Sequence, residues 1–128
     1  MAYCNEKTVE GSFAEIKEAV IAALKAEGMG VISEINMKAA LKEKINADIP
    51  EYQILGACHP PSAFQAVSKE KNIGVLLPCN FIIRQEGENS IVIAAVNPMQ
   101  TMQSVLNPEL NDIAEEISAK INRVLESI

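Results

Sequence analysis

The stretch VLLPCNFIIRQEGENSIVIAAV, residues 75–96, decides the fold class of this chain. Residues 75–86 and 91–96 both read as strands, because they contain the β-branched and aromatic residues that are typical of strands. The Gly-Glu-Asn sequence at residues 87–89 favours a tight turn, and it is too short for a crossover helix. We therefore predict an antiparallel hairpin. Pro78 cannot donate to a strand ladder, so it marks a bend or an edge in the first strand.

Three further segments upstream of this hairpin have the composition of strands: residues 3–9, 31–35 and 52–58. Only short helical insertions separate the later strands, one capped by Asn36 and one over residues 62–69. Another short helix is expected after the fifth strand, following Asn97 and Pro98. Strands that follow one another so closely favour antiparallel pairing.

Two longer amphipathic helices are predicted, one on each side of the run of four strands. The first begins at Ser12, which forms a capping box with Glu15, and it ends at Gly28. The second begins after the cap residue Asn107 and Pro108. Both have an apolar stripe at helical spacing. The order strand, helix, four strands, helix predicts an α+β fold, with an antiparallel sheet and helices on one face.

Length and charge limit the domain organisation and the partners. The 128 residues fit one domain, residues 1–128. The net charge of −6 argues against nucleic acid and against an anionic membrane surface, which both attract basic proteins. No run approaches the roughly 20 apolar residues that span a bilayer, and the N-terminus has no apolar leader. We therefore expect a cytoplasmic protein.

The candidate site is formed by two segments, ILGACHPP at residues 54–61 and IGVLLPCN at residues 73–80. Cys58 closes one predicted strand, and Cys79 lies near the start of the next. If the two strands pair antiparallel, these thiols become neighbours at one edge of the sheet, with His59 and Asn80 close by. These four residues form one candidate cluster, and the family motif that the two segments resemble makes them candidate binding residues.

Several interpretations of the cysteines remain open. The functional ones are a redox thiol pair, a nucleophilic cysteine and a soft-metal site, and the structural one is packing, since cysteine is often buried as a small hydrophobe. A structural zinc site normally needs four ligands, so no metal and no other cofactor is expected. His59 is the only histidine, but alternation points it away from Cys58 within a regular strand. No catalytic residue is assigned, and an enzyme is not the favoured hypothesis.

The segments Ile54–Pro60 and Gly74–Asn80 resemble the paired signature of the bacterial and archaeal DUF302 family, a domain of unknown function. Glu34-Ile-Asn-Met37 and Asn97-Pro-Met99 support the resemblance, which extends over essentially the whole chain. It implies an architecture like that of the TATA-binding protein, which also occurs in proteins that hold a ligand between sheet and helix. It carries no known activity. Family members tend to have asparagine where this chain has His59.

The leading hypothesis is a small cytoplasmic domain that binds a small ligand or a partner in a regulatory role. We also expect a homodimer, because self-association is a common way to cover an exposed sheet face or edge. One alternative is a thiol-based redox or soft-metal-binding protein that uses Cys58 and Cys79. The other alternative is a structural homodimeric interaction module without a ligand.

Overall fold

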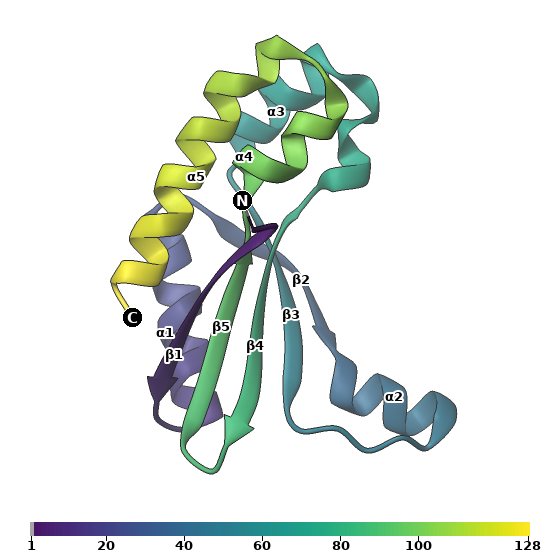
Figure 1. Cartoon of the computed structure of the whole chain (residues 1–128), viewed down its shortest axis with the longest axis vertical. Helices are drawn as coiled ribbons and strands as arrows, with labels where there is room; N and C mark the ends of the chain where they lie inside the picture. The colour runs from purple at the N-terminus through teal and green to yellow at the C-terminus, as the bar shows by residue number, and fades with distance from the viewer. Residues whose placement is uncertain (1) are drawn as a thin grey trace.

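The chain folds around one five-stranded antiparallel sheet (Figure 1). The structure is a computed structural model that describes residues 2–128. The strand order is β1-β5-β4-β3-β2, so β2 to β5 form a meander and β1 returns to pair with β5. The strands are β1 (Cys4–Glu10), β2 (Gly30–Asn36), β3 (Tyr52–Cys58), β4 (Cys79–Gly87) and β5 (Ser90–Val96). The α+β class and the antiparallel sheet are thus confirmed, whereas the likeness to the TATA-binding protein stays an expectation.

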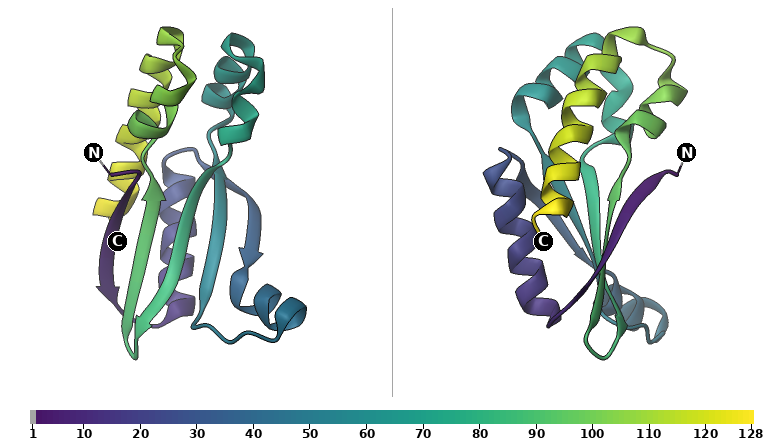
Figure 2. Two further views of the ribbon diagram at one scale, coloured as in Figure 1. Left: turned by 45° about the vertical axis from the view of Figure 1, so that its right-hand side comes forward. Right: turned by 60° about the vertical axis from the view of Figure 1, so that its left-hand side comes forward.

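Two amphipathic helices, α1 (Phe13–Ala26) and α5 (Asn111–Glu126), pack on the same face of the sheet (Figure 2). The helix α1 begins where predicted, because the side chain of Ser12 accepts a hydrogen bond from the backbone N–H of Glu15. Val20 of α1 and Ile121 of α5 belong to the same buried cluster as Phe81 of β4. This layer between sheet and helices is the hydrophobic core.

Shorter helices fill the connections. They are α2 (Met37–Ile45), α3 (Pro60–Lys69), α4 (Pro98–Thr101) and the 3-10 helices η1 (Lys71–Leu76), η2 (Met102–Val105) and η3 (Pro108–Leu110). Asn36 caps α2 as predicted, by accepting from the N–H of Ala39. The helices α3 and α4 and the N-terminal part of α5 gather beyond one end of the sheet (Figure 1). No helix within residues 2–128 has the length and apolarity to cross a bilayer.

The strand predicted over residues 75–86 was wrong at its start. Val75 and Leu76 belong to η1, and β4 begins only at Cys79. Pro78, just before the strand, has no N–H to donate to a neighbouring strand. Pairing therefore starts after it, with Cys79 opposite Ala57 of β3. The effect is to leave open space beside the last residues of β3, which is where the candidate site lies.

Candidate functional site

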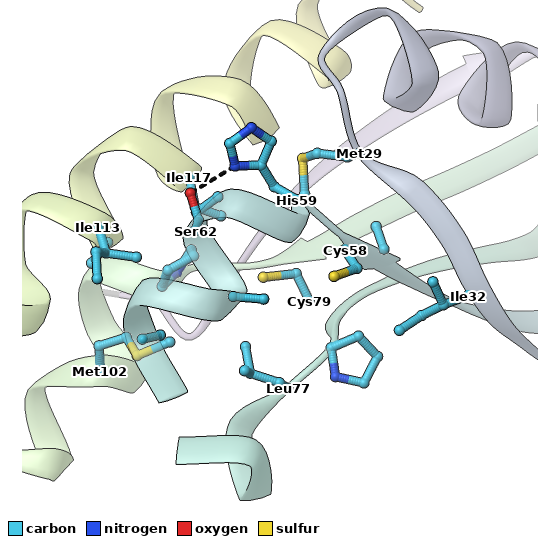
Figure 3. Close-up of a pocket in the computed structure, with 16 residues that line it drawn as sticks. Met29, Ile32, Cys58, His59, Ser62, Leu77, Cys79, Met102, Ile113 and Ile117 are labelled. Carbon is cyan, nitrogen blue, oxygen red and sulfur yellow. Dashed lines mark hydrogen bonds between the residues drawn. The ribbon is translucent and has the colours of Figure 1, made fainter. Parts of the chain in front are cut away.

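A pocket of about 300 Å³ opens at the end of the sheet where β3 stops and β4 begins (Figure 3). The strand ends form one wall, and α3 and α5 form the others. The start of α4 and the first residue of η2 close the pocket. Representative lining residues are Met29, Ala57, Ala66, Met102, Ala114 and Ile117. The lining is almost wholly apolar, so the pocket suits an apolar molecule.

Cys58 and Cys79 both line this pocket, although they start from opposite faces of the sheet. The register pairs Ala57 with Cys79, so Cys79 shares the helix-covered face with Phe81. Alternation directs Cys58, one residue further along, toward the other face. The two thiols still meet the same space because the pocket wraps around the end of the strands (Figure 3). The structure therefore brings together the two cysteines that the sequence singled out.

The two thiols differ in their electrostatic surroundings. Burial raises the pKa of the Cys79 thiol to about 11, and the nearby Cys58 adds to the rise. Cys79 is therefore protonated at neutral pH, which opposes a role as a nucleophilic thiolate. Cys58 is only half-buried, so a reagent from solvent reaches it more easily.

His59 lies at the pocket and not in a solvent-facing loop. It occupies the N-cap position of α3, and its Nδ1 lies 2.7 Å from the hydroxyl oxygen of Ser62 in a hydrogen bond. The ring lies against Gly28: a Cβ atom added at residue 28 would lie 3.4 Å from Cδ2 of His59. Gly28 has a φ of +74°, a conformation that glycine adopts without strain. The strand β3 ends at Cys58, so the alternation of side chains between the two faces of the sheet does not extend to His59. The His59 ring and the Cys58 thiol can therefore both line the pocket.

Asn80, the fourth candidate residue, is not brought to the pocket. It follows Cys79 in β4, so its side chain points to the opposite face of the sheet, where it is exposed. The register places it opposite Gly56 of β3. Asn80 was expected at the site because it is next to Cys79 in the sequence. In the pleated strand, however, the side chains of Cys79 and Asn80 point to opposite faces.

Sequence reasoning missed several pocket residues. Met102, in the predicted short helical stretch after the fifth strand, and Ile117, in the apolar stripe of the last predicted helix, were not proposed as site residues, yet both line the pocket. Their spacing showed that they were buried but not what they would face, because that depends on how the helices dock. Gly56 does not line the pocket but acts through Pro78, which does: a Cβ at residue 56 would overlap the Ser33 side chain and lie 2.5 Å from Cγ of Pro78. Its lack of a side chain lets Pro78 cross β3 closely and form the rim.

The chemistry open to this site is binding by apolar and sulfur atoms. Within the described residues 2–128, no three His, Cys, Asp or Glu side chains come together in a group that could hold a metal ion. The sulfur atoms come from Cys58 and Cys79 on the strand ends, from Met29 in the turn before β2 and from Met102 at the start of η2 (Figure 3). Thioether and thiol sulfur are soft and polarizable, and thioethers make favourable contacts with aromatic rings.

Comparisons with known proteins agree on one family. The family model described as "Domain of unknown function DUF302" matches residues 5–128. The chain is also similar to the crystal structure of an uncharacterized conserved protein DUF302 from Bacillus stearothermophilus. The TM-score is 0.91 at 25% sequence identity, over 99% of this chain and 98% of the other. No curated protein matches the chain. The matched residues take in the whole sheet except its first residue, together with both cysteine segments, and this chain therefore belongs to the DUF302 family.

Proposed function

We propose that this chain is a cytoplasmic ligand-binding domain with a regulatory role, and that it holds a small apolar molecule in the pocket beside Cys58 and Cys79. The observation that carries the proposal is the pocket of about 300 Å³ at the end of the sheet. Pockets that take small ligands begin at about 300 Å³ and are lined mainly by apolar side chains. The size and the apolar lining of this pocket therefore support a small bound molecule.

The lining also indicates the class of ligand. Of the described residues that line the pocket, none is Asp, Glu, Lys or Arg. A charged ligand would lose its hydration there without gaining a charged partner, which is costly. The thioether sulfurs of Met29 and Met102 and the two thiols line the pocket, and such sulfur atoms make favourable contacts with an aromatic ring. His59 and Ser62 are polar groups on the lining, where they can meet one polar substituent. A small, neutral aromatic molecule fits this combination.

Filling the pocket should weaken binding. Ala114 lines the pocket from α5, whereas Ala119 is exposed on the same helix. The neutral aromatic fluorophore N-phenylnaphthylamine should bind the wild type and gain fluorescence. We expect Ala114→Leu to weaken its affinity at least about tenfold, or about 1.4 kcal/mol, because the larger side chain occupies the space. The matched variant Ala119→Leu should bind as the wild type does.

Thermal unfolding followed by circular dichroism checks that both leucine variants are folded. If both variants and the wild type bind the fluorophore equally well, its site lies elsewhere and the pocket is not the ligand site. A wild type that produces no fluorescence gain at any protein concentration would count against an aromatic ligand of this size.

Thiol redox chemistry is a second candidate, because both thiols line one pocket. In such a reaction the two sulfur atoms bond to each other, and two protons and two electrons pass to an oxidant such as diamide. In a Cys4→Ser background we expect diamide to lower the intact mass of the monomer by two hydrogens. The same treatment of a Cys58→Ser, Cys4→Ser variant should leave the monomer mass without that loss. Alkylatable thiols in equal number before and after diamide would exclude this candidate.

A further inference from the structure

Sulfur is the main donor atom on the lining of the pocket. The sulfur atoms belong to Cys58, Cys79, Met29 and Met102. No Asp or Glu is among the described lining residues, and the His59 ring and the Ser62 hydroxyl hydrogen-bond to each other. Soft metal ions prefer thiolate and thioether sulfur, whereas hard ions prefer oxygen. The lining therefore has the donor atoms that a soft metal ion selects.

The two thiols come from neighbouring strands. Cys79 is paired with Ala57, and Cys58 is the next residue along β3. Paired residues of an antiparallel ladder have Cα atoms about 5 Å apart and the strand rises about 3.4 Å per residue, so the two cysteine Cα atoms lie about 6 Å apart. A metal–thiolate bond is about 2.3 Å long, so two sulfur atoms up to about 4.6 Å apart can share one ion. Cysteines on backbones this close can therefore reach the same ion.

Both thiols also point into one space. Alternation directs Cys58 and Cys79 toward opposite faces of the sheet, but β3 ends at Cys58 and the pocket wraps around the strand ends. The sulfur atoms of both residues are turned into the pocket (Figure 3). The two groups also interact electrostatically, since Cys58 adds to the raised pKa of Cys79. The register and the pocket thus bring the two sulfur atoms together.

We propose that Cys58 and Cys79 hold one Cu(I) ion between their sulfur atoms at the strand ends. Zinc normally needs four ligands, and residues 2–128 contain no cluster of even three His, Cys, Asp or Glu side chains. Cu(I) is soft, and two thiolates are enough to hold it. Each copper–sulfur bond forms as one thiol proton leaves to solvent, and neither copper nor sulfur changes its oxidation state. The inference does not rest on the apolar ligand proposed above.

The ion has a path from solvent to both ligands. Cys58 is half-buried, and Ile32 on the same lining is 65% exposed, whereas Cys79 is 8% exposed. Cys58 is thus the outer ligand and Cys79 the inner one. The proton on Cys79 is no obstacle, because a coordinating thiol is deprotonated outright. Two thiolates and one Cu(I) leave one net negative charge, which stays in partial contact with water beside Cys58 and so costs less to bury.

Cys4 provides a matched control within the same chain. It is a free thiol at the start of β1, an edge strand of the sheet, and it does not line the pocket. Like Cys58, it is half-buried. If copper bound to any accessible thiol, Cys4 would hold it as well as Cys58 does.

Competition for Cu(I) tests the site. The full chain is kept metal-free, reduced and anaerobic, and it competes with the chelator bicinchoninate for Cu(I) while native mass spectrometry counts the bound ions. We expect one Cu(I) per chain for the wild type and for Cys4→Ser. In the Cys4→Ser background, Cys58→Ala and Cys79→Ala should each lower the affinity at least about a hundredfold, because losing even a group that supports a metal ligand costs about ten- to a hundredfold.

Circular dichroism shows whether each variant is folded. Cys58 is only half-buried, so Cys58→Ala tests the proposal even if the substitution at the buried Cys79 prevents folding. A wild type that takes no Cu(I) from bicinchoninate would overturn the proposal. So would a folded Cys58→Ala variant that binds as tightly as its Cys4→Ser parent, and so would loss of the ion in Cys4→Ser alone.

X-ray absorption at the copper edge gives an independent readout. In the copper-loaded Cys4→Ser variant we expect sulfur atoms as the nearest neighbours of copper, and a shell of nitrogen or oxygen alone would refute the site. Binding of N-phenylnaphthylamine is measured separately on the metal-free protein. Failure of the apolar-ligand proposal removes the fluorescence gain, whereas failure of the copper site removes the bound copper, so the two are distinguished.

Discussion

Replacing Phe81 by alanine is expected to lower the free energy of unfolding by about 4 kcal/mol. Phe81 has no exposed surface, and it lies on the helix-covered face of β4, directly opposite Leu55 of β3. Removing the ring takes away buried apolar contacts and leaves a cavity that the neighbouring strands cannot fill. Urea unfolding of wild type and variant measures the difference.

The same substitution at Phe64 is the matched control. Phe64 lies on α3 and is 76% exposed, so Phe64→Ala should change the free energy of unfolding by no more than about 0.5 kcal/mol. A loss below about 1 kcal/mol for Phe81→Ala would contradict the packing of α1 and α5 on this face. A large loss for Phe64→Ala would show instead that α3 is covered in solution.

Raising the pH should destabilise the protein through Cys79. Burial raises the pKa of this thiol from an ordinary value of 9.0 to about 11 in the folded chain. Below about pH 9 the thiol is protonated in both the folded and unfolded states, so its contribution is fully present. Between these two pKa values the unfolded chain ionises first, and the stability falls. A pKa difference of this size corresponds to a loss of up to about 3 kcal/mol above pH 11.

The comparison with Cys79→Ala isolates this effect, because tyrosines and lysines titrate in both proteins. The stability advantage of the wild type over Cys79→Ala should shrink as the pH rises from about 8 to about 11. Leu77→Ala, beside the same pocket, removes no ionisable group, so the difference between it and the wild type should stay constant. A wild-type advantage over Cys79→Ala that stays constant with pH would show that Cys79 is not buried in solution.

Local signals located most of the elements. The strand predicted over residues 52–58 has the observed bounds of β3, since alternation there ends at the break before Pro60 and Pro61. Ser12 and Gly28 bracketed α1 because a cap side chain and a left-handed glycine act within a few residues. The start of β4 was predicted wrongly because the apolar run at residues 75–77 is compatible with a strand. Only the three-dimensional structure shows that this run forms no ladder with another strand, since Val75 and Leu76 belong to η1.

The candidate site could be anticipated only in part. The order of the strands indicated that Cys58 and Cys79 lie at one edge of the sheet, and the structure places both at one pocket. The register was needed to show that Asn80 points away from them. No sequence signal revealed the pocket itself, because it is a space left between α3, α5 and the strand ends.

The sequence by itself determined the α+β class, the antiparallel pairing of the successive strands and the two long helices, because caps, turns and alternation act over a few residues. The tertiary structure alone decided the register and the pocket. Those features depend on residues far apart in the chain, such as Met29 of the turn after α1 and Ile117 of α5, which both line the pocket. Docking between elements is set by the packing of whole surfaces, and no short stretch of sequence encodes it.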